Sequence, residues 1–206
     1  MIMGAIEFVV FDMNEVLYDW DPQVRLKLLE ELTGRPAAEI DAAVWGGPHE
    51  AEAEAGNPGT AEGYLEQFGK LLDYPIDFET WADIHRRMMR PRPDVLDLVR
   101  QVKTRADVAM LTNNGMMLKA VLPDCAPEMI EIFGEKAHVS AEFKVRKPDP
   151  QIYRRICGKY GHAPERSAFI DDKEANVRGA EEAGLVGHVY TTYEDFRSFL
   201  GRHELI

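Results

Sequence analysis

Short apolar runs recur at five places along the chain, and they constrain its fold more than any other feature. Each run is four to six residues long, as is typical of a buried β-strand, and longer segments with helical patterning separate the runs. This alternation predicts an α/β fold, a doubly wound parallel sheet with helices on both faces. The predicted strands are Ile6–Phe11, Val108–Thr112, Ala137–Ser140, Ser167–Ile170 and Gly187–Tyr190.

The segment between the first two predicted strands has about ninety residues, far more than one crossover helix needs. Gly- and Pro-containing breaks divide it into segments with helical patterning. We therefore predict a helical cap subdomain at residues 20–90, inserted into a core of residues 1–19 and 91–206. The cap would lie over the ends of the strands. Its predicted helices are Val24–Thr33, Glu39–Val44, Ala61–Leu72 and Phe78–Met89.

The net charge of −12, from 24 basic and 36 acidic residues, argues against nucleic acid or anionic membranes as partners. No apolar run approaches the roughly 20 residues that a membrane span needs. The first residues do not have the pattern of a signal peptide, so we expect a cytoplasmic location. Cys125 and Cys157 are too few for a disulfide framework and are expected to be reduced. Nothing in the sequence indicates an oligomeric state.

Polar side chains follow three of the predicted strands. Asp12 comes after the first strand, Thr112 and Asn113 end the second, and Asp171 and Asp172 end the fourth. Ligands of doubly wound sheets bind at the carboxyl ends of the strands, so we expect these side chains to lie close together. Asp12 would stand where a nucleophile could act. Thr112 and Asn113, with the N–H groups of a following helix, would form a cradle for an oxyanion.

The adjacent carboxylates of Asp171 and Asp172 repel each other unless a cation or a hydrogen-bond network compensates. With Asp12 nearby, Mg²⁺ is the natural cation because it prefers hard oxygen ligands. Lys147 lies just before a predicted helix, in a loop that two prolines restrict, so its ammonium would be held rigidly beside an anion. A bound cation or such a lysine is needed because the chain as a whole would repel an anionic substrate.

These segments, in this order, resemble the four motifs of the haloacid dehalogenase superfamily, in its phosphatase-like branch. The resemblance covers the core, essentially residues 6–19 and 91–192, and the helical insertion is similar to that superfamily's small helical cap in position and character. The resemblance implies that the core has a Rossmann-like fold and that the protein is a hydrolase. The segments are Phe8–Leu17, Met110–Gly115, Lys144–Tyr153 and Ser167–Asn176.

The resemblance also implies roles for individual residues. In the phosphatases of this superfamily the leading Asp of the first motif, here Asp12, attacks phosphorus and forms an aspartyl-phosphate that water hydrolyses. Thr112 and the backbone N–H of Asn113 would hold the transferring phosphoryl oxygens, and Lys147 would offset their charge. The substrate would be a small phosphorylated molecule.

The metal site implied by the resemblance binds Mg²⁺ as the cofactor. Its ligands would be Asp12, the backbone carbonyl of Asn14, and Asp172, with Asp171 as a supporting acid.

Asn14 departs from the pattern of these phosphatases, which generally place an Asp there to exchange a proton with the leaving oxygen. An amide can donate a hydrogen bond but cannot transfer this proton. Because general acid/base catalysis typically contributes about 10²- to 10⁴-fold, turnover should be weak unless another group replaces the acid. Glu15 is the nearest candidate, but in an extended segment it points away from Asn14. His49 and His85 are further candidates, although both are expected to be ordinary surface histidines.

Three functions compete on this evidence. The first is a magnesium-dependent phosphatase, and the second is a phosphate-ligand binding or regulatory protein that has lost turnover. The third is a 2-haloacid dehalogenase, whose superfamily relatives also lack an Asp at the position of Asn14 but act without a metal. The acidic run at residues 50–54 is expected to be solvated. The aromatic side chains of the insertion, Trp45, Tyr64, Phe68 and Trp81, are expected to pack between helices rather than contact substrate.

Overall fold

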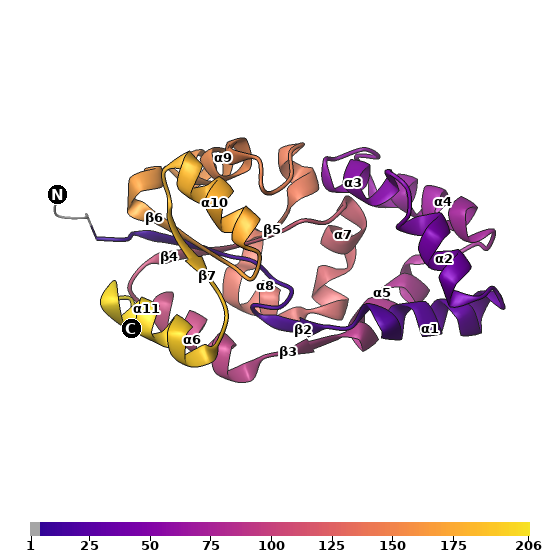
Figure 1. The fold of residues 1–206 in the computed structure, drawn as a ribbon, viewed down its shortest axis with the longest axis horizontal. Coiled ribbons are helices and arrows are strands. Elements are labelled where there is room, and N and C mark those ends of the chain that lie inside the picture. Colours follow the sequence, from indigo (N-terminus) through magenta and orange to yellow (C-terminus); the bar gives the residue numbers. More distant parts are fainter. Residues whose placement is uncertain (1–4) are drawn as a thin grey trace.

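The central sheet of this computed structural model, which describes residues 5–206, consists of five parallel strands in the order β5-β4-β1-β6-β7 (Figure 1). The prediction of a parallel α/β sheet is confirmed, and each strand lies within two residues of its predicted limits. The strands are β1 (Phe8–Phe11), β4 (Asp107–Thr112), β5 (Ala137–Val139), β6 (Ser167–Asp171) and β7 (Val186–Val189).

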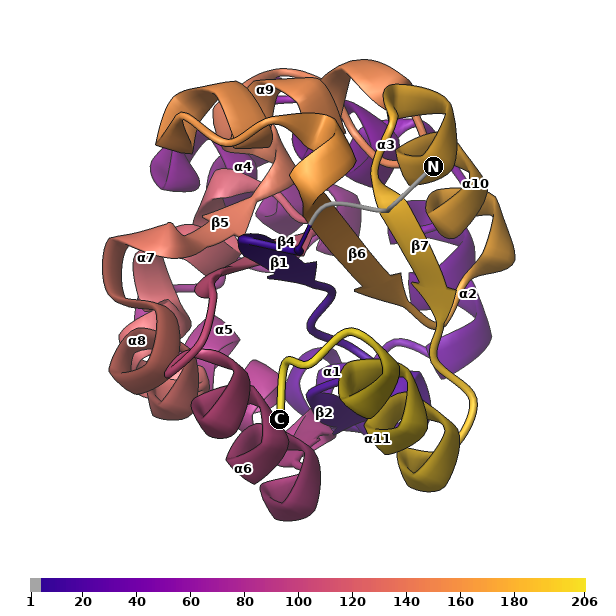
Figure 2. The same cartoon turned by 90° about the vertical axis from the view of Figure 1, so that its left-hand side faces the viewer.

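Both faces of the sheet are covered by helices, as Figure 2 shows along the strands. Helices α9 (Pro150–Tyr160) and α10 (Glu174–Ala183) cover one face, and α6 (Pro93–Val102), α8 (Pro127–Phe133) and α11 (Tyr193–Arg202) cover the other. Successive residues of β1 alternate between the two sides: Phe8 and Val10 belong to one hydrophobic cluster, Val9 and Phe11 to the other. This alternation follows from the two-residue period of a strand, and it gives the domain two apolar cores.

A two-stranded antiparallel ribbon joins the sheet domain to the inserted helices. Its strands, β2 (Tyr18–Trp20) and β3 (Met89–Pro91), pair with Tyr18 opposite Pro91. Between them lie the cap helices, which occupy the right-hand end of Figure 1 and pack through α4 and α5 on α7 (Met116–Cys125). The cap helices are α1 (Pro22–Thr33), α2 (Ala37–Val44), α3 (His49–Glu54), α4 (Ala61–Leu72) and α5 (Phe78–Met88).

Three of the cap helices begin at a residue whose side chain caps the helix. Asp21, Thr60 and Asp77 each accept a hydrogen bond from a backbone N–H of the first turn of α1, α4 and α5. Such caps satisfy donors that have no partner within the helix, and each typically stabilises a helix by about 1 kcal/mol. The short 3₁₀ helices η1 (Gly134–Lys136), η2 (Ser140–Phe143) and η3 (Pro164–Arg166) lie in the connections of the sheet domain.

Two further expectations concern the whole chain. Cys125 and Cys157 are both buried free thiols, as predicted. Within residues 5–206, none of the helices combines the length and the apolar character that crossing a membrane requires.

Candidate active site

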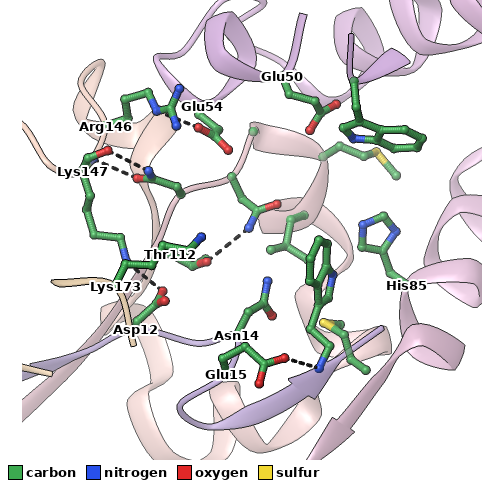
Figure 3. A pocket seen from close by; sticks show the side chains of 18 of the residues that line it. Asp12, Asn14, Glu15, Glu50, Glu54, His85, Thr112, Arg146, Lys147 and Lys173 are labelled. Carbon is green, nitrogen blue, oxygen red and sulfur yellow. Dashed lines mark hydrogen bonds and ion pairs between the residues drawn. The ribbon is translucent and has the colours of Figure 1, made fainter. Parts of the chain in front are cut away.

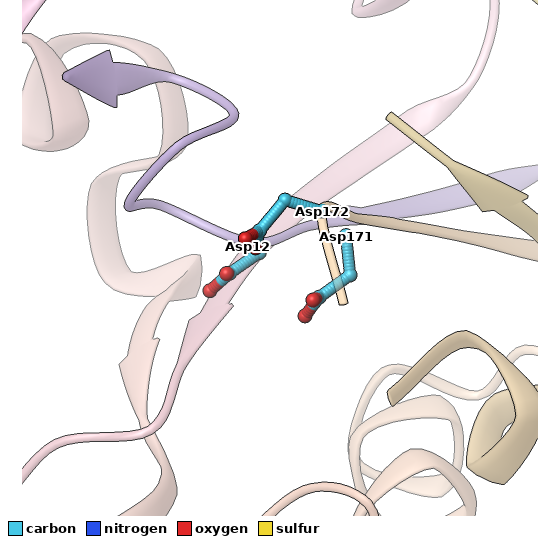
Figure 4. Close-up of side chains that lie close together, drawn as sticks. All are labelled: Asp12, Asp171 and Asp172. Atoms are coloured by element: carbon cyan, nitrogen blue, oxygen red, sulfur yellow. The ribbon is translucent and has the colours of Figure 1, made fainter. Parts of the chain in front are cut away.

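Asp12 lies directly after β1 at the carboxyl edge of the sheet, where its backbone N–H donates to the carbonyl of Ile170 at 2.9 Å. Its side chain is buried, and one carboxylate oxygen from each of Asp12, Asp171 and Asp172 lies within 4.8 Å of the others (Figure 4). The structure thus brings these three carboxylates together. Three hard oxygen donors at this spacing fit a Mg²⁺ ion, which prefers carboxylates and retains water or phosphate oxygens in its shell.

The ammonium of Lys147 lies between two of these carboxylates. Its Nζ is 2.7 Å from Oδ1 of Asp12 and 2.6 Å from Oδ2 of Asp171, and the side chain is buried. Asn113 holds the lysine's backbone in place: its amide nitrogen donates to the carbonyl of Lys147, and its amide oxygen accepts from the N–H of Lys147, both at 2.9 Å. Asn113 was expected in the site as part of an oxyanion cradle, and the bonds of its side chain to the backbone of Lys147 were not predicted.

Burial and charge oppose each other in this cluster. Burial raises the pKa of Asp12 to about 6, although the ammonium of Lys147 favours the carboxylate form. For Lys147, burial favours the neutral amine, but Asp12 and Asp171 together hold its pKa above the usual value. Lys147 is therefore a permanent cation beside Asp12 at neutral pH.

Asp171 and Asp172 have different surroundings although they are adjacent in the sequence. The carboxylate of Asp171 accepts hydrogen bonds from Nδ2 of Asn176 at 3.0 Å and from the N–H of Lys173 at 2.8 Å, besides the ion pair with Lys147. Asp172 lines the cavity above the sheet, and burial together with the charge of Asp171 raises its pKa. Protein donors surround Asp171, while Asp172 faces the space where a ligand would bind.

The end of β4 supplies a hydroxyl and a stretch of loop backbone. Thr112 is buried, and its Oγ1 accepts a hydrogen bond from Nδ2 of Asn114 at 3.2 Å. The following helix, α7, begins only at Met116 with Gly115 as its N-cap. The expectation that the N–H groups of a following helix directly adjoin Thr112 and Asn113 is therefore wrong, because three residues, 113–115, separate the strand from the helix. The N–H groups next to Thr112 therefore belong to a loop rather than to a helix terminus.

The chain turns sharply after Asn14. Glu15 has a φ of +61°, and the N–H groups of Leu17 and Tyr18 donate to the carbonyl of Met13. The side chain of Asn14 lies beside Asp12 in the cavity, where its buried Oδ1 has no hydrogen-bond partner within residues 5–206 (Figure 3).

The carboxylate of Glu15 also borders the cavity, but protein donors hold it. Nη2 of Arg92 lies 2.8 Å from its Oε2, and the N–H of Trp20 donates to its Oε1 at 3.2 Å. Protein donors thus hold the carboxylate of Glu15, while the amide of Asn14 lies beside Asp12 in the cavity.

A cavity of about 380 Å³ extends from Asp12 into the cap helices. Four basic and five acidic side chains line it, so its walls carry one more negative than positive charge in their usual ionised forms. A bound divalent cation would make the cavity favourable for a phosphate. The charged lining residues are Arg25, Arg146, Lys147, Lys173, Asp12, Glu15, Glu50, Glu54 and Asp172.

The packing of helices α3 and α5 differs from two expectations about the insertion. The run at residues 50–54 is solvated only in part: α3 leaves Ala51 and Glu52 exposed but turns Glu50 and Glu54 into the cavity, and both carboxylates point toward its centre in Figure 3. His49 and His85 are not surface histidines, since both are buried. Burial lowers the pKa of His85 to about 3, so its imidazole is neutral and is no proton donor at neutral pH.

The aromatic residues of the cap helices pack against one another, as expected. Trp45 and Tyr64 both contact Phe68, and Tyr64 meets Trp81 edge to face. All four also line the cavity, so the expectation that they do not contact substrate stays a prediction. Sequence patterning misses this because the same helix face both packs and borders the space above Asp12.

Known proteins resemble this chain along most of its length. A family model described as haloacid dehalogenase-like hydrolase matches residues 6–184. A phosphoserine phosphatase from Thermus thermophilus is 29% identical over 184 residues, which are 82% of this chain and 66% of that protein. A phosphorylated carbohydrates phosphatase from Thermotoga maritima is 24% identical, over 87% of this chain and 82% of that protein. The chain therefore spans just under two thirds of the Thermus protein's length.

The fold has solved counterparts as well. A HAD family enzyme from Bacteroides thetaiotaomicron, solved in complex with magnesium and inorganic phosphate, superposes with a TM-score of 0.78 at 21% identity, covering 94% of this chain and 98% of that one. That structure supports the α/β architecture described above. Together with the match over residues 6–184, it shows that the chain belongs to the haloacid dehalogenase-like hydrolases, with phosphatases among its relatives.

Proposed function

We propose that the protein is a magnesium-dependent phosphatase that hydrolyses small phosphorylated metabolites through an aspartyl-phosphate on Asp12. The observation that carries the proposal is the position of Asp12. Its carboxylate stands within reach of two further carboxylates and an ammonium at the mouth of a cavity. A phosphate bound there would meet a nucleophile, a counter-charge and a site for a cation at once.

Each residue of the core has a role in this proposal. Asp12 attacks phosphorus, and the bond to the leaving oxygen breaks as the new bond forms. Thr112 and the loop N–H of Asn113 hold the phosphoryl oxygens, while Lys147 offsets their charge. Asp12, Asp172 and the backbone carbonyl of Asn14 would hold Mg²⁺, with Asp171 orienting Lys147 beside them. The ion supplies positive charge where two anionic groups approach each other.

The cap helices would close the cavity over the bound phosphate. We place the boundaries of this cap subdomain at residues 20 and 90, within the β2–β3 ribbon. Its aromatic side chains exclude water from the reacting groups, which strengthens the electrostatic interactions inside.

The test is phosphate release from an activated aryl phosphate with Mg²⁺ present. Asp12→Asn should abolish release, whereas Asp124→Asn, which changes an exposed Asp away from the cavity, should not alter it. Release that persists in Asp12→Asn would show that the nucleophile is another group.

The competing functions are separate outcomes of the same set of assays. Binding of phosphorylated ligands without release from any ester would favour a regulatory protein that has lost turnover, as the amide at Asn14 allows. Halide release from 2-haloacids in the presence of EDTA would favour a dehalogenase. Asn14→Asp should increase release from esters with poor leaving groups, because it restores a carboxyl at the position of the usual acid.

A further inference from the structure

Arg25 of α1 is a cation in the cap cavity that forms no ion pair with a carboxylate of residues 5–206. Its guanidinium carbon lies 3.5 Å from the ring centroid of Trp45 and 5.5 Å from that of Trp20. The buried Nε finds no hydrogen-bond partner among residues 5–206, and no carboxylate in that range comes within 4.0 Å of Arg25. Indole rings cover the faces of the guanidinium and leave its N–H edges for another acceptor.

This arrangement is costly for the protein alone. Burial lowers the pKa of Arg25 even though Glu50 and Tyr64 favour the charged form. A buried cation normally has a paired anion or a full set of hydrogen bonds, because its desolvation is otherwise uncompensated. Stacking on Trp45 explains where the guanidinium lies, but it does not satisfy its donors.

An anion faces the same cavity from α3. Oε1 of Glu50 accepts the hydroxyl of Tyr64 at 2.6 Å and lies 3.8 Å from Nε2 of His49, and no ion pair joins Glu50 to Arg25. A cation and an anion are thus held apart in a space with aromatic walls. Such a pair can bind a ligand that presents an acceptor to one group and a donor to the other.

We propose, building on the phosphatase function above, that Arg25 binds a carboxylate on the leaving group and that Glu50 receives an ammonium or hydroxyl beside it. The substrate class is therefore a small phosphorylated carboxylic acid, either an amino acid or a hydroxy acid. A planar carboxylate matches the guanidinium edge with two parallel hydrogen bonds. A second phosphate in that place would bring more negative charge next to Glu50.

Four esters with similar leaving groups test the two contacts separately. O-phosphoserine carries a carboxylate and an ammonium on its leaving group. O-phosphoethanolamine carries only the ammonium, and 3-phosphoglycerate carries only the carboxylate. Glycerol 3-phosphate carries neither of these two groups. The wild-type kcat/KM should be higher for the two esters with a carboxylate, O-phosphoserine and 3-phosphoglycerate, than for the other two. Arg25→Gln should lower kcat/KM about 10- to 100-fold for these two and leave the other two nearly unchanged, as expected for the loss of a charge-assisted hydrogen bond.

The controls remove a charge from the same helices outside the cavity. Lys27→Gln on α1 and Glu52→Gln on α3 change exposed side chains and should not change the order of preference. An equal loss on all four esters in Arg25→Gln, or no wild-type preference for carboxylates, would overturn the proposal.

A binding experiment separates this proposal from the phosphatase function. Calorimetry with Asp12→Asn as host should show tighter binding of 3-phosphoglycerate than of glycerol 3-phosphate, and this difference should disappear when Arg25→Gln is added. The difference would persist if the protein binds phosphorylated acids without hydrolysing them. Its absence would refute the carboxylate site even if phosphatase activity is found.

A second, independent observation concerns the missing proton carrier. Glu54, at the end of α3, lies in the cavity with its side chain 18% exposed. Nε of Arg146 is 2.8 Å from its Oε2, but the N–H is not aligned for a hydrogen bond, and Oε2 has no other partner within residues 5–206. Oε2 is thus buried against Arg146, while the carboxyl group as a whole borders the cavity.

The backbone around Glu54 is docked firmly on the core. The hydroxyl of Ser140 donates to the carbonyl of Glu54 at 2.7 Å, and a side chain at Gly56 would come within 2.9 Å of the carbonyl of Ala141. Burial and the nearby Glu50 raise the pKa of Glu54 to about 7, although Arg146, Lys147 and Lys173 oppose this rise. A substantial fraction of this group is thus protonated at neutral pH, as a general acid requires.

We infer that Glu54 is the general acid that replaces the carboxyl absent at Asn14, given the proposed phosphatase mechanism. As Asp12 attacks phosphorus, the bond to the leaving oxygen breaks and that oxygen takes the proton of Glu54, leaving a carboxylate beside Arg146. In the second step the carboxylate takes a proton from the attacking water, the bond between phosphorus and Asp12 breaks, and phosphate is formed.

The test compares leaving groups. Glu54→Gln should lower kcat/KM about 10²- to 10⁴-fold for an alkyl phosphate but less than about 10-fold for 4-nitrophenyl phosphate, whose leaving group needs no proton. The alkaline limb of the wild-type pH profile on the alkyl ester, near pH 7, should disappear in this variant. Adding Asn14→Asp to Glu54→Gln should restore activity toward the alkyl ester, and Glu52→Gln should behave as wild type.

Equal losses on both esters, or a failure of Asn14→Asp to rescue, would show that Glu54 acts only in packing. Loss of the phosphatase function itself would look different, because the wild type would then release phosphate from neither ester.

Discussion

The ammonium nitrogen of Lys147 lies 2.7 Å from Oδ1 of Asp12, and both side chains are buried at the edge of the sheet. The same ammonium lies 2.6 Å from Asp171, so one cation compensates two carboxylates. Each of these charges would be unfavourable alone in this environment. Lys147 is therefore needed for the folded state as well as for the chemistry proposed for Asp12.

We predict that Lys147→Met destabilises the protein by about 3–5 kcal/mol, because it leaves two buried carboxylates without their cation. Urea unfolding at pH 7.5 without added metal measures this loss. Lys159→Met, which changes an exposed lysine of α9, should stay within about 0.5 kcal/mol of the wild type. The loss should also shrink at acidic pH as the carboxylates become protonated. A change of less than about 1 kcal/mol in Lys147→Met would contradict the assigned role.

We expect His85 to make stability fall with decreasing pH. Its pKa is about 3 in the folded protein and 6.5 in its usual state, so between these values the unfolded chain binds a proton that the folded protein does not. The free energy of unfolding therefore decreases as pH falls below 6.5, by about 2 kcal/mol at pH 5 from this group. His85→Phe, which keeps a ring to stack on Trp81, should lose about 2 kcal/mol less than wild type between pH 8 and 5. Equal losses would show that His85 is protonated in the folded state.

The sheet could be predicted from the sequence because its strands are buried on both faces and read as continuous apolar runs. Three short elements with neither an apolar run nor a helical pattern were missed. Helix α3 is a six-residue segment of alternating acids and alanines, and β2 and β3 have three residues each. Their structure depends on what they pack against rather than on a local pattern.

The core of the candidate site was predictable for a similar reason: Asp12, Asp171 and Lys147 each stand at a fixed place relative to a strand or helix. The cap part was not, because Arg25 and Glu54 approach Asp12 only through the packing of whole helices. The four-residue spacing of Glu50 and Glu54 does indicate that they share one helix face, but not which way that face points.

Magnesium should stabilise the folded protein if the three carboxylates bind it. At a concentration 100 times its dissociation constant the ion would contribute about 2.7 kcal/mol, so the unfolding temperature should rise with added Mg²⁺. Asp172→Asn should abolish most of this rise, since Asp172 lines the cavity. Asp195→Asn, at an exposed Asp of α11, is the matched control. An equal rise in both variants would place the ion elsewhere.

The loop that carries Lys147 is held by a close approach between Gly179 of α10 and Pro148. A Cβ atom at Gly179 would lie 2.0 Å from the carbonyl oxygen of Pro148, so no side chain fits without moving the loop. Gly158 of α9 has no atom within 4 Å of the corresponding position. Both glycines lie inside helices, where alanine is ordinarily favoured by about 1 kcal/mol.

We therefore predict opposite effects for the same substitution. Gly158→Ala should stabilise the protein by about 0.5–1 kcal/mol, because it restricts the unfolded chain. Gly179→Ala should destabilise it by about 1–3 kcal/mol, since the contact with Pro148 outweighs helix propensity, and it should lower phosphate release by displacing Lys147. Chemical unfolding of both variants, with release from an aryl phosphate as the second measurement, checks the pair. Stabilisation by both would mean that α10 and the Lys147 loop can separate without cost.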